Sequence, residues 1–136
     1  MFAKLIIVMN KSRIKEAKED CEMLAEIVIH GMQEKKAKNI VYLDLRGLHH
    51  AVTDFFVICH GDSNTQVGAI AASVEEEIRK ATGEKPWHRE GFENAEWILL
   101  DYVNVVVHVF QKPQRDFFRL ESLWGDAKIE KVETQE

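Results

Sequence analysis

The segment Cys59-His60-Gly61-Asp62-Ser63 has the residue types from which an anion or phosphate site is built. It follows the apolar run Phe55–Cys59 and precedes a segment of helical periodicity, so backbone N–H groups at a helix start would face a ligand. One glycine is weak evidence, and the sequence contains neither a P-loop nor a GxGxxG pattern. We therefore favour the simpler interpretation, a tight turn at Gly61 followed by Ser63 as a helix N-cap.

The same order of strand, Gly-x-Ser and helix resembles the start of nucleotidyltransferase folds. Those enzymes hold a divalent metal with paired carboxylates, typically Asp-x-Asp, for phosphoryl transfer. No Asp-x-Asp occurs in the sequence, and the carboxylates of Glu75 and Glu77 would point apart on a helix. Transferase chemistry is thus disfavoured. A nucleotide-binding or nucleotidyltransferase-like enzyme that uses the Gly61–Ser63 loop stays as the alternative function.

Other catalytic and metal-binding patterns are missing from the sequence. The histidines are scattered and form neither His-Glu-x-x-His nor a matched Cys/His set. Ser63 lacks the Gly-x-Ser-x-Gly context of a nucleophile elbow. We therefore expect no catalytic residue, no metal site and no cofactor. The histidines are His30, His49, His50, His60, His88 and His108.

The composition fits one domain with an ordinary core, because the chain has 136 residues of which 46% are hydrophobic. Asp plus Glu is 23 against 18 for Lys plus Arg, and the net charge of -5 argues against direct DNA binding and substantial direct RNA binding. The same negative charge is compatible with a basic protein partner. The apolar run Leu5–Met9 is far shorter than the ~20 residues of a membrane span. With two cysteines, a cytoplasmic location is expected.

Hydrophobic periodicity predicts an α/β fold, with a single mixed β-sheet flanked by helices. Strands 97–101 and 105–110 read as a β-hairpin. The predicted helices span 12–36, 63–82 and 114–124, and the predicted strands 40–46, 55–59, 97–101 and 105–110, with a short strand within 83–96. Inward positions are Val67, Ile70, Ala71, Val74 and Ile78 of the second helix and Phe117, Leu120 and Trp124 of the third.

One domain is expected over residues 12–128. Residues 1–11 form an N-terminal extension, either a disordered tail or the product of an upstream start site. Residues 129–136 form a charged tail, and the chain is expected to fray from Gly125 onward.

Five of the aromatic residues in the last third of the chain are informative about function. Aromatic side chains at strand ends and helix flanks often anchor protein interfaces, although half-burial explains each one equally well alone. Together with nearby carboxylates they predict an acidic and aromatic patch that suits a basic protein surface. The aromatic residues are Trp97, Tyr102, Phe117, Phe118 and Trp124, and the carboxylates are Asp101 and Glu121.

Two long runs carry a resemblance to a known family. They are YLDLRGLHHAVTDFFVICHGDSNTQVGAIA and REGFENAEWILLDYVNVVVHVFQKPQRDFFRLESLWGDA. The chain resembles the Iojap-related ribosomal silencing factor family, RsfS, over roughly residues 12–128. The shared features include the Gly-x-Ser turn with Gln66, the pair Glu90-Gly91, and Arg115 followed by Leu-Glu-x-Leu-Trp. The resemblance implies a nucleotidyltransferase-like minimal core without catalytic carboxylates, and no enzyme activity.

The resemblance also implies a partner. Such factors bind ribosomal protein fourteen of the large subunit (uL-fourteen), sterically block association with the small subunit, and repress translation when nutrients are limiting. Trp97 matches the family tryptophan that lies against this protein, and the other residues of the implied site are Asp101, Tyr102, Phe118 and Glu121.

Two departures from the family pattern stand out. Phe118 stands where the family commonly has tyrosine, and Val103-Asn104 replaces the usual Gly-Asp of the hairpin turn. The oligomeric state stays open, with a homodimer of the free protein as one outcome.

Overall fold

The computed structural model describes residues 21–49 and 51–132. The expectations for residues 1–11 and for a helix start at Ser12 lie outside these residues. Within them, six strands form one sheet in the order β3-β4-β5-β2-β1-β6. Strands β2 and β5 run parallel, and the other four neighbouring pairs are antiparallel. The strands are β1 (Lys38–Asp44), β2 (Phe55–Gly61), β3 (His88–Glu90), β4 (Trp97–Asp101), β5 (Val105–Gln111) and β6 (Lys128–Lys131).

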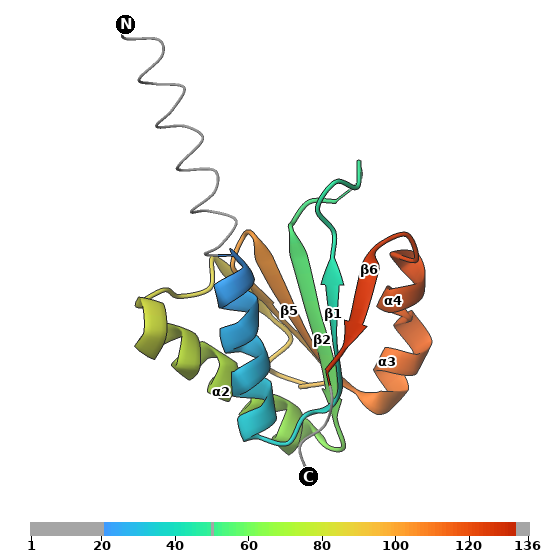
Figure 1. Ribbon diagram of the computed structural model, residues 1–136. Helices are drawn as coiled ribbons and strands as arrows, with labels where there is room; N and C mark the ends of the chain where they lie inside the picture. Colours follow the sequence, from blue (N-terminus) through green and yellow to red (C-terminus); the bar gives the residue numbers. More distant parts are fainter. Residues whose placement is uncertain (1–20, 50, 133–136) are drawn as a thin grey trace, which may run out of the picture.

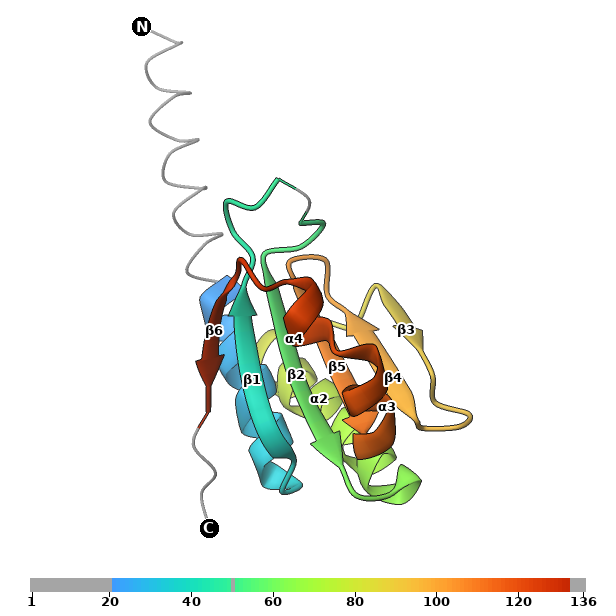
Figure 2. The same cartoon turned by 90° about the vertical axis from the view of Figure 1, so that its right-hand side faces the viewer.

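Helices cover both faces of the sheet. A first helix, described over 21–34, and α2 (Asn64–Thr82) lie on one face, which we call the inner face. The short helices α3 (Lys112–Phe118) and α4 (Leu120–Leu123) lie on the opposite, outer face. Figure 1 shows the sheet between the two helix layers, and Figure 2 looks onto the outer face with α3 and α4 in front. The predicted mixed sheet flanked by helices is confirmed.

Strand β2 is buried along its whole length, as the continuous apolar run predicts. Its side chains alternate between two cores. Phe55, Val57 and Cys59 face the inner helices, whereas Phe56 and Ile58 face the outer ones.

Helix α2 confirms the predicted N-cap and stripe. The Ser63 hydroxyl accepts a hydrogen bond from the Gln66 backbone N–H at 3.1 Å, and the helix ends at Gly83 with φ 77°. Its buried positions are the five predicted ones, Val67, Ile70, Ala71, Val74 and Ile78.

Helix α2 also packs closely on the first helix. A Cβ at Gly31 would meet the Cα of Val74 at 2.9 Å, and the Ser73 hydroxyl donates to the Gly31 carbonyl at 2.8 Å. The glycine therefore lets the two inner helices touch.

Two expectations near the C-terminal end are wrong. The single helix over 114–124 is broken at Arg119, which adopts a left-handed φ of 47°. The break leaves Phe117 80% exposed instead of inward, while Leu120 and Trp124 do pack on the outer core. The segment from Gly125 does not fray throughout, because β6 pairs with β1 and so satisfies its backbone hydrogen bonds.

Candidate functional site

A stack of four aromatic rings rises from the outer core to the surface. Trp97, the first residue of β4, packs on buried Phe110 with ring centroids 4.9 Å apart. Phe118 is the last residue of α3, and its ring centroid lies 4.8 Å from that of Trp97. Phe117 meets Phe118 edge-on at 5.1 Å and is 80% exposed. The break at Arg119 thus turns two phenylalanines outward, beside Trp97.

An open groove of about 730 Å³ begins at this stack. Trp97 and Phe118 line the groove together with the end of β3 and the connection between β3 and β4. Glu90, at the end of β3, and Glu93 and Glu96 of the connection contribute three exposed carboxylates, against one basic lining residue, Arg89. The groove is therefore both acidic and aromatic, which is the chemistry expected from the sequence. The residues predicted for the site do not include these three glutamates, although Glu90 stands in the family pair Glu90-Gly91 and the three recur at a three-residue spacing.

The wall of the groove is fixed by its backbone. Gly91 has φ 90°, and a Cβ there would lie 1.9 Å from the Trp97 carbonyl oxygen, so no other residue fits. The Gln111 backbone N–H donates to the Glu96 carbonyl at 2.8 Å. The Gln111 side chain donates to the Ala95 carbonyl at 3.1 Å. These bonds hold the loop at the end of β5, beside Trp97.

Beneath the stack, the Trp97 indole N–H donates to Nδ1 of His108 at 3.1 Å. His108 is 3% exposed, and burial lowers its pKa to about 3. The imidazole is therefore neutral at physiological pH and serves as an acceptor for the indole.

Glu121 is brought near the stack, but its carboxylate is already paired. Its Oε1 accepts from Nε and Nη2 of Arg115 at 3.0 and 2.8 Å. Arg115 is also directed at the sheet, where Nη1 lies 2.9 Å from Nδ1 of His60 and 3.3 Å from the Lys38 carbonyl oxygen. Arg115 thus links α3 and α4 to the start of β1 and the end of β2.

Asp101 and Tyr102 lie away from the stack. Asp101 is at the opposite end of β4 from Trp97, where Oδ1 accepts from the Val103 backbone N–H at 2.7 Å. Tyr102 is 7% exposed and packs in the inner core, and burial raises the pKa of its hydroxyl. The five predicted residues therefore do not form a single patch, because Asp101 lies at the far end of β4 from Trp97 and Tyr102, one residue further, faces the inner core. Their contact with a partner stays a prediction.

The loop Gly61–Ser63 is closed by Gln66. Its Oε1 accepts from the Asp62 N–H at 2.7 Å, and its Nε2 lies 3.3 Å from the carbonyl oxygens of both Lys35 and Lys36. A Cβ at Gly61 would already touch this side chain at 3.2 Å. Because the Asp62 N–H is already paired with Gln66 and the Ser63 hydroxyl caps the helix, the geometry favours the turn and N-cap.

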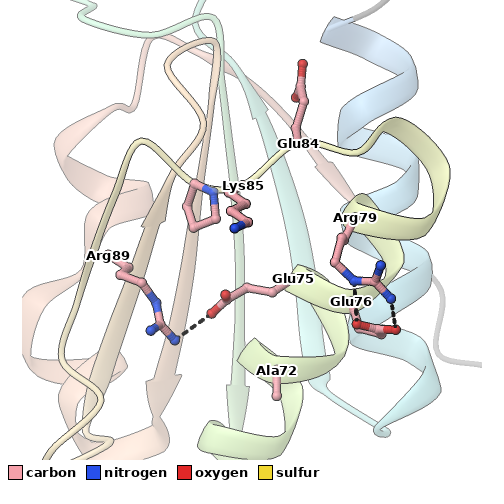
Figure 3. A pocket seen from close by; sticks show the side chains of 8 residues that line it. Ala72, Glu75, Glu76, Arg79, Glu84, Lys85 and Arg89 are labelled. Carbon is pink, nitrogen blue, oxygen red and sulfur yellow. Dashed lines mark hydrogen bonds and ion pairs between the residues drawn. The ribbon is translucent and has the colours of Figure 1, made fainter.

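A second hollow, of about 450 Å³, lies between α2 and the segment that leads into β3 (Figure 3). Its two arginines pair with glutamates that also line it. Arg89 reaches across to Glu75 at 2.9 Å, and Arg79 bonds Glu76 on the same helix at 2.6 Å. The hollow holds matched ion pairs rather than a set of converging catalytic groups.

Two further features bear on the class of protein. Over residues 21–49 and 51–132, no cluster of three His, Cys, Asp or Glu side chains is placed to hold a metal ion. None of the helices in these ranges has the length and hydropathy that crossing a bilayer requires.

Similar proteins fit this picture. The profile of the family described as "Ribosomal silencing factor during starvation" matches residues 17–136. The chain is 40% identical over 110 residues to the ribosomal silencing factor RsfS of Halalkalibacterium halodurans, covering 81% of this chain and 92% of that protein. It is 41% identical over 106 residues to RsfS of Bacillus subtilis, covering 78% and 88%.

A solved structure agrees as well. The crystal structure of a Chromobacterium violaceum protein superposes with a TM-score of 0.72 at 33% identity, covering 85% of this chain and 95% of that one. The resemblance on which the sequence analysis relied is confirmed. By its sequence over nearly all of its length, and by its fold, the chain belongs to the ribosomal silencing factor family.

Proposed function

We propose that this protein binds ribosomal protein fourteen (uL-fourteen) on the large ribosomal subunit in the cytoplasm. Bound there, it blocks association with the small subunit and so represses translation when nutrients are limiting. The observation that carries the proposal is a groove lined by the pair Trp97 and Phe118 together with Glu90, Glu93 and Glu96.

Physical reasoning supports this choice. Aromatic side chains held in place beside a groove supply most of the binding energy in many interfaces. Carboxylates around them favour a basic partner and speed association. An interface of standard size, about 1,600 Å², is enough to occlude a subunit contact, so the role needs no catalytic group.

Co-sedimentation with isolated large ribosomal subunits tests the proposal, with wild type beside Trp97→Ala. Trp87→Ala is the matched control, because Trp87 is 77% exposed and precedes β3 at the far end of β4 from Trp97. We expect Trp97→Ala to weaken binding by roughly 2 kcal/mol or more, as for a hot-spot residue, and Trp87→Ala to bind like wild type.

Two further arms identify the partner and the consequence. Purified ribosomal protein fourteen should compete with the large subunit for the wild-type chain, and bound wild type should block joining of small subunits. Equal sedimentation of Trp97→Ala and wild type contradicts the site, and a folded wild type that does not bind contradicts the function. A nucleotide-dependent rise in melting temperature would instead favour the enzyme alternative.

A further inference from the structure

The hydrogen bond between Trp97 and His108 runs diagonally between neighbouring strands. In the β4–β5 ladder Trp97 faces Phe110 and Leu99 faces His108, so the indole reaches back along the strand to the imidazole. Because Nδ1 accepts the indole proton, the proton of the neutral imidazole sits on Nε2.

Nε2 of His108 lies in apolar surroundings. The imidazole and the Phe56 ring form a T-shaped pair with centroids 4.6 Å apart, and the Phe110 ring lies 6.2 Å away. Among the residues that the structure describes, Nε2 has no hydrogen-bond partner. A buried N–H without a partner costs free energy that an apolar ring of similar size would not cost. Stability therefore does not explain a histidine at this position, and the bond to Trp97 is what it contributes.

This bond decides what Trp97 can offer to another molecule. Phe110 and Phe118 pack on the indole, and its N–H is directed into the protein. The part of the indole that a molecule in the groove can contact is therefore aromatic carbon. Such a surface suits an aliphatic side chain or a cation rather than a hydrogen-bond acceptor.

We propose that His108 is a positioning residue, which holds the Trp97 indole in one orientation so that the partner meets its carbon surface and not its N–H. The inference rests on the proposed function, since it takes Trp97 as a contact of the large ribosomal subunit. Neutral at physiological pH, His108 keeps this orientation without a charge beneath the docking surface.

Two variants separate positioning from stability. His108→Phe keeps the ring shape and removes both the acceptor and the unpartnered N–H. His108→Asn keeps an acceptor oxygen near the place of Nδ1. We expect His108→Phe to melt at the wild-type temperature or above and to bind large subunits at least tenfold more weakly. We expect His108→Asn to melt lower and to bind within threefold of wild type.

Hydrogen exchange of the indole protons supplies a readout that does not depend on the ribosome. In wild type, the Trp97 indole proton should exchange more slowly than that of exposed Trp87, and in His108→Phe the two should become similar. His108→Asn should restore the slow exchange.

Each other outcome has a defined meaning. Wild-type affinity in His108→Phe overturns the positioning role alone, and so does equal loss of binding in both variants. A His108→Phe chain that fails to fold overturns the argument that the histidine costs stability. A wild-type chain that does not bind large subunits overturns the proposed function and this inference with it, whatever the exchange rates are.

Discussion

Nη1 of Arg115 lies 2.9 Å from Nδ1 of His60, so a guanidinium from α3 meets an imidazole from β2 on the outer face of the sheet. His60 is 3% exposed, and its pKa is lowered from 6.5, first by burial and then by the positive charges of Arg115 and Lys112. Asp62 and Asp116 oppose the shift but do not reverse it. Docking of α3 therefore depends on an uncharged His60.

Acidification should destabilise the protein through His60. Below pH 6.5 the unfolded chain binds a proton that the folded chain does not, so the free energy of unfolding falls until the folded pKa is reached. The slope approaches about 1.4 kcal/mol per pH unit for one such group. Urea titrations between pH 7 and pH 5 measure the summed slope of His60 and of buried His108, whose lowered pKa acts in the same direction. His60→Asn, which keeps an acceptor for Arg115, should give a shallower slope, and an unchanged slope would assign the loss to other groups.

Arg115→Lys should lower the free energy of unfolding by about 2 kcal/mol. A lysine cannot reach Glu121, His60 and the Lys38 carbonyl together, and Glu121 is left partly buried without its forked partner. The control is Lys112→Ala on the same helix, where the exposed pair with Asp116 should contribute little to the free energy of unfolding. Equal effects of the two changes in chemical denaturation would contradict the anchoring role of Arg115.

Val103→Gly should stabilise the chain by about 1 kcal/mol. Val103 has φ 74°, in the left-handed region that β-branched residues avoid. The Val103 N–H donates to the Asp101 carboxylate and its carbonyl accepts from the Thr53 hydroxyl, and neither bond needs the valine side chain. The control is Val52→Gly, because Val52 is an exposed loop residue without a positive φ. This change should not raise the free energy of unfolding. Thermal unfolding of both variants checks this, and a lower melting temperature for Val103→Gly would refute it.

Reversing charge in the groove should slow association with large subunits. Glu93→Lys or Glu96→Lys is expected to weaken binding roughly threefold to tenfold at low salt, and less at high salt as screening grows. Glu130→Lys makes the same change of net charge on β6, at the other edge of the sheet, and should have little effect. If all three variants weaken binding equally, the effect comes from net charge and not from the groove.

The sequence predicts those parts of the fold whose hydrophobic pattern is long enough to be recognised without knowledge of tertiary contacts. Helix α2 has 19 residues, so its stripe is read over several turns and all five buried positions were predicted. β2 was identifiable because a strand buried on both faces has few polar side chains.

The errors came from features that tertiary contacts impose. Arg119 adopts a left-handed conformation that is usual for glycine, so nothing in the sequence marks a helix end there. A helix that continues through Arg119 would have Phe117 facing inward and Phe118 outside the apolar stripe. Tyr102 was assigned to the surface because it follows a strand, yet its position one residue past Asp101 puts it on the inner face. Trp97 and Phe118 were identified as site residues, but the groove between them and the three glutamates needs the packed loop at Gly91.

The pairing of β6 with β1 has a consequence for synthesis on the ribosome. β1 is synthesised before β2, with which it pairs along one edge. Its other edge pairs with residues 128–131, which are synthesised after all the other strands. A nascent chain paused before them exposes an open strand edge, the kind of surface from which chains associate wrongly. Completion of the sheet is therefore a late event in translation of this chain, and slowing elongation ahead of β6 should raise its tendency to aggregate.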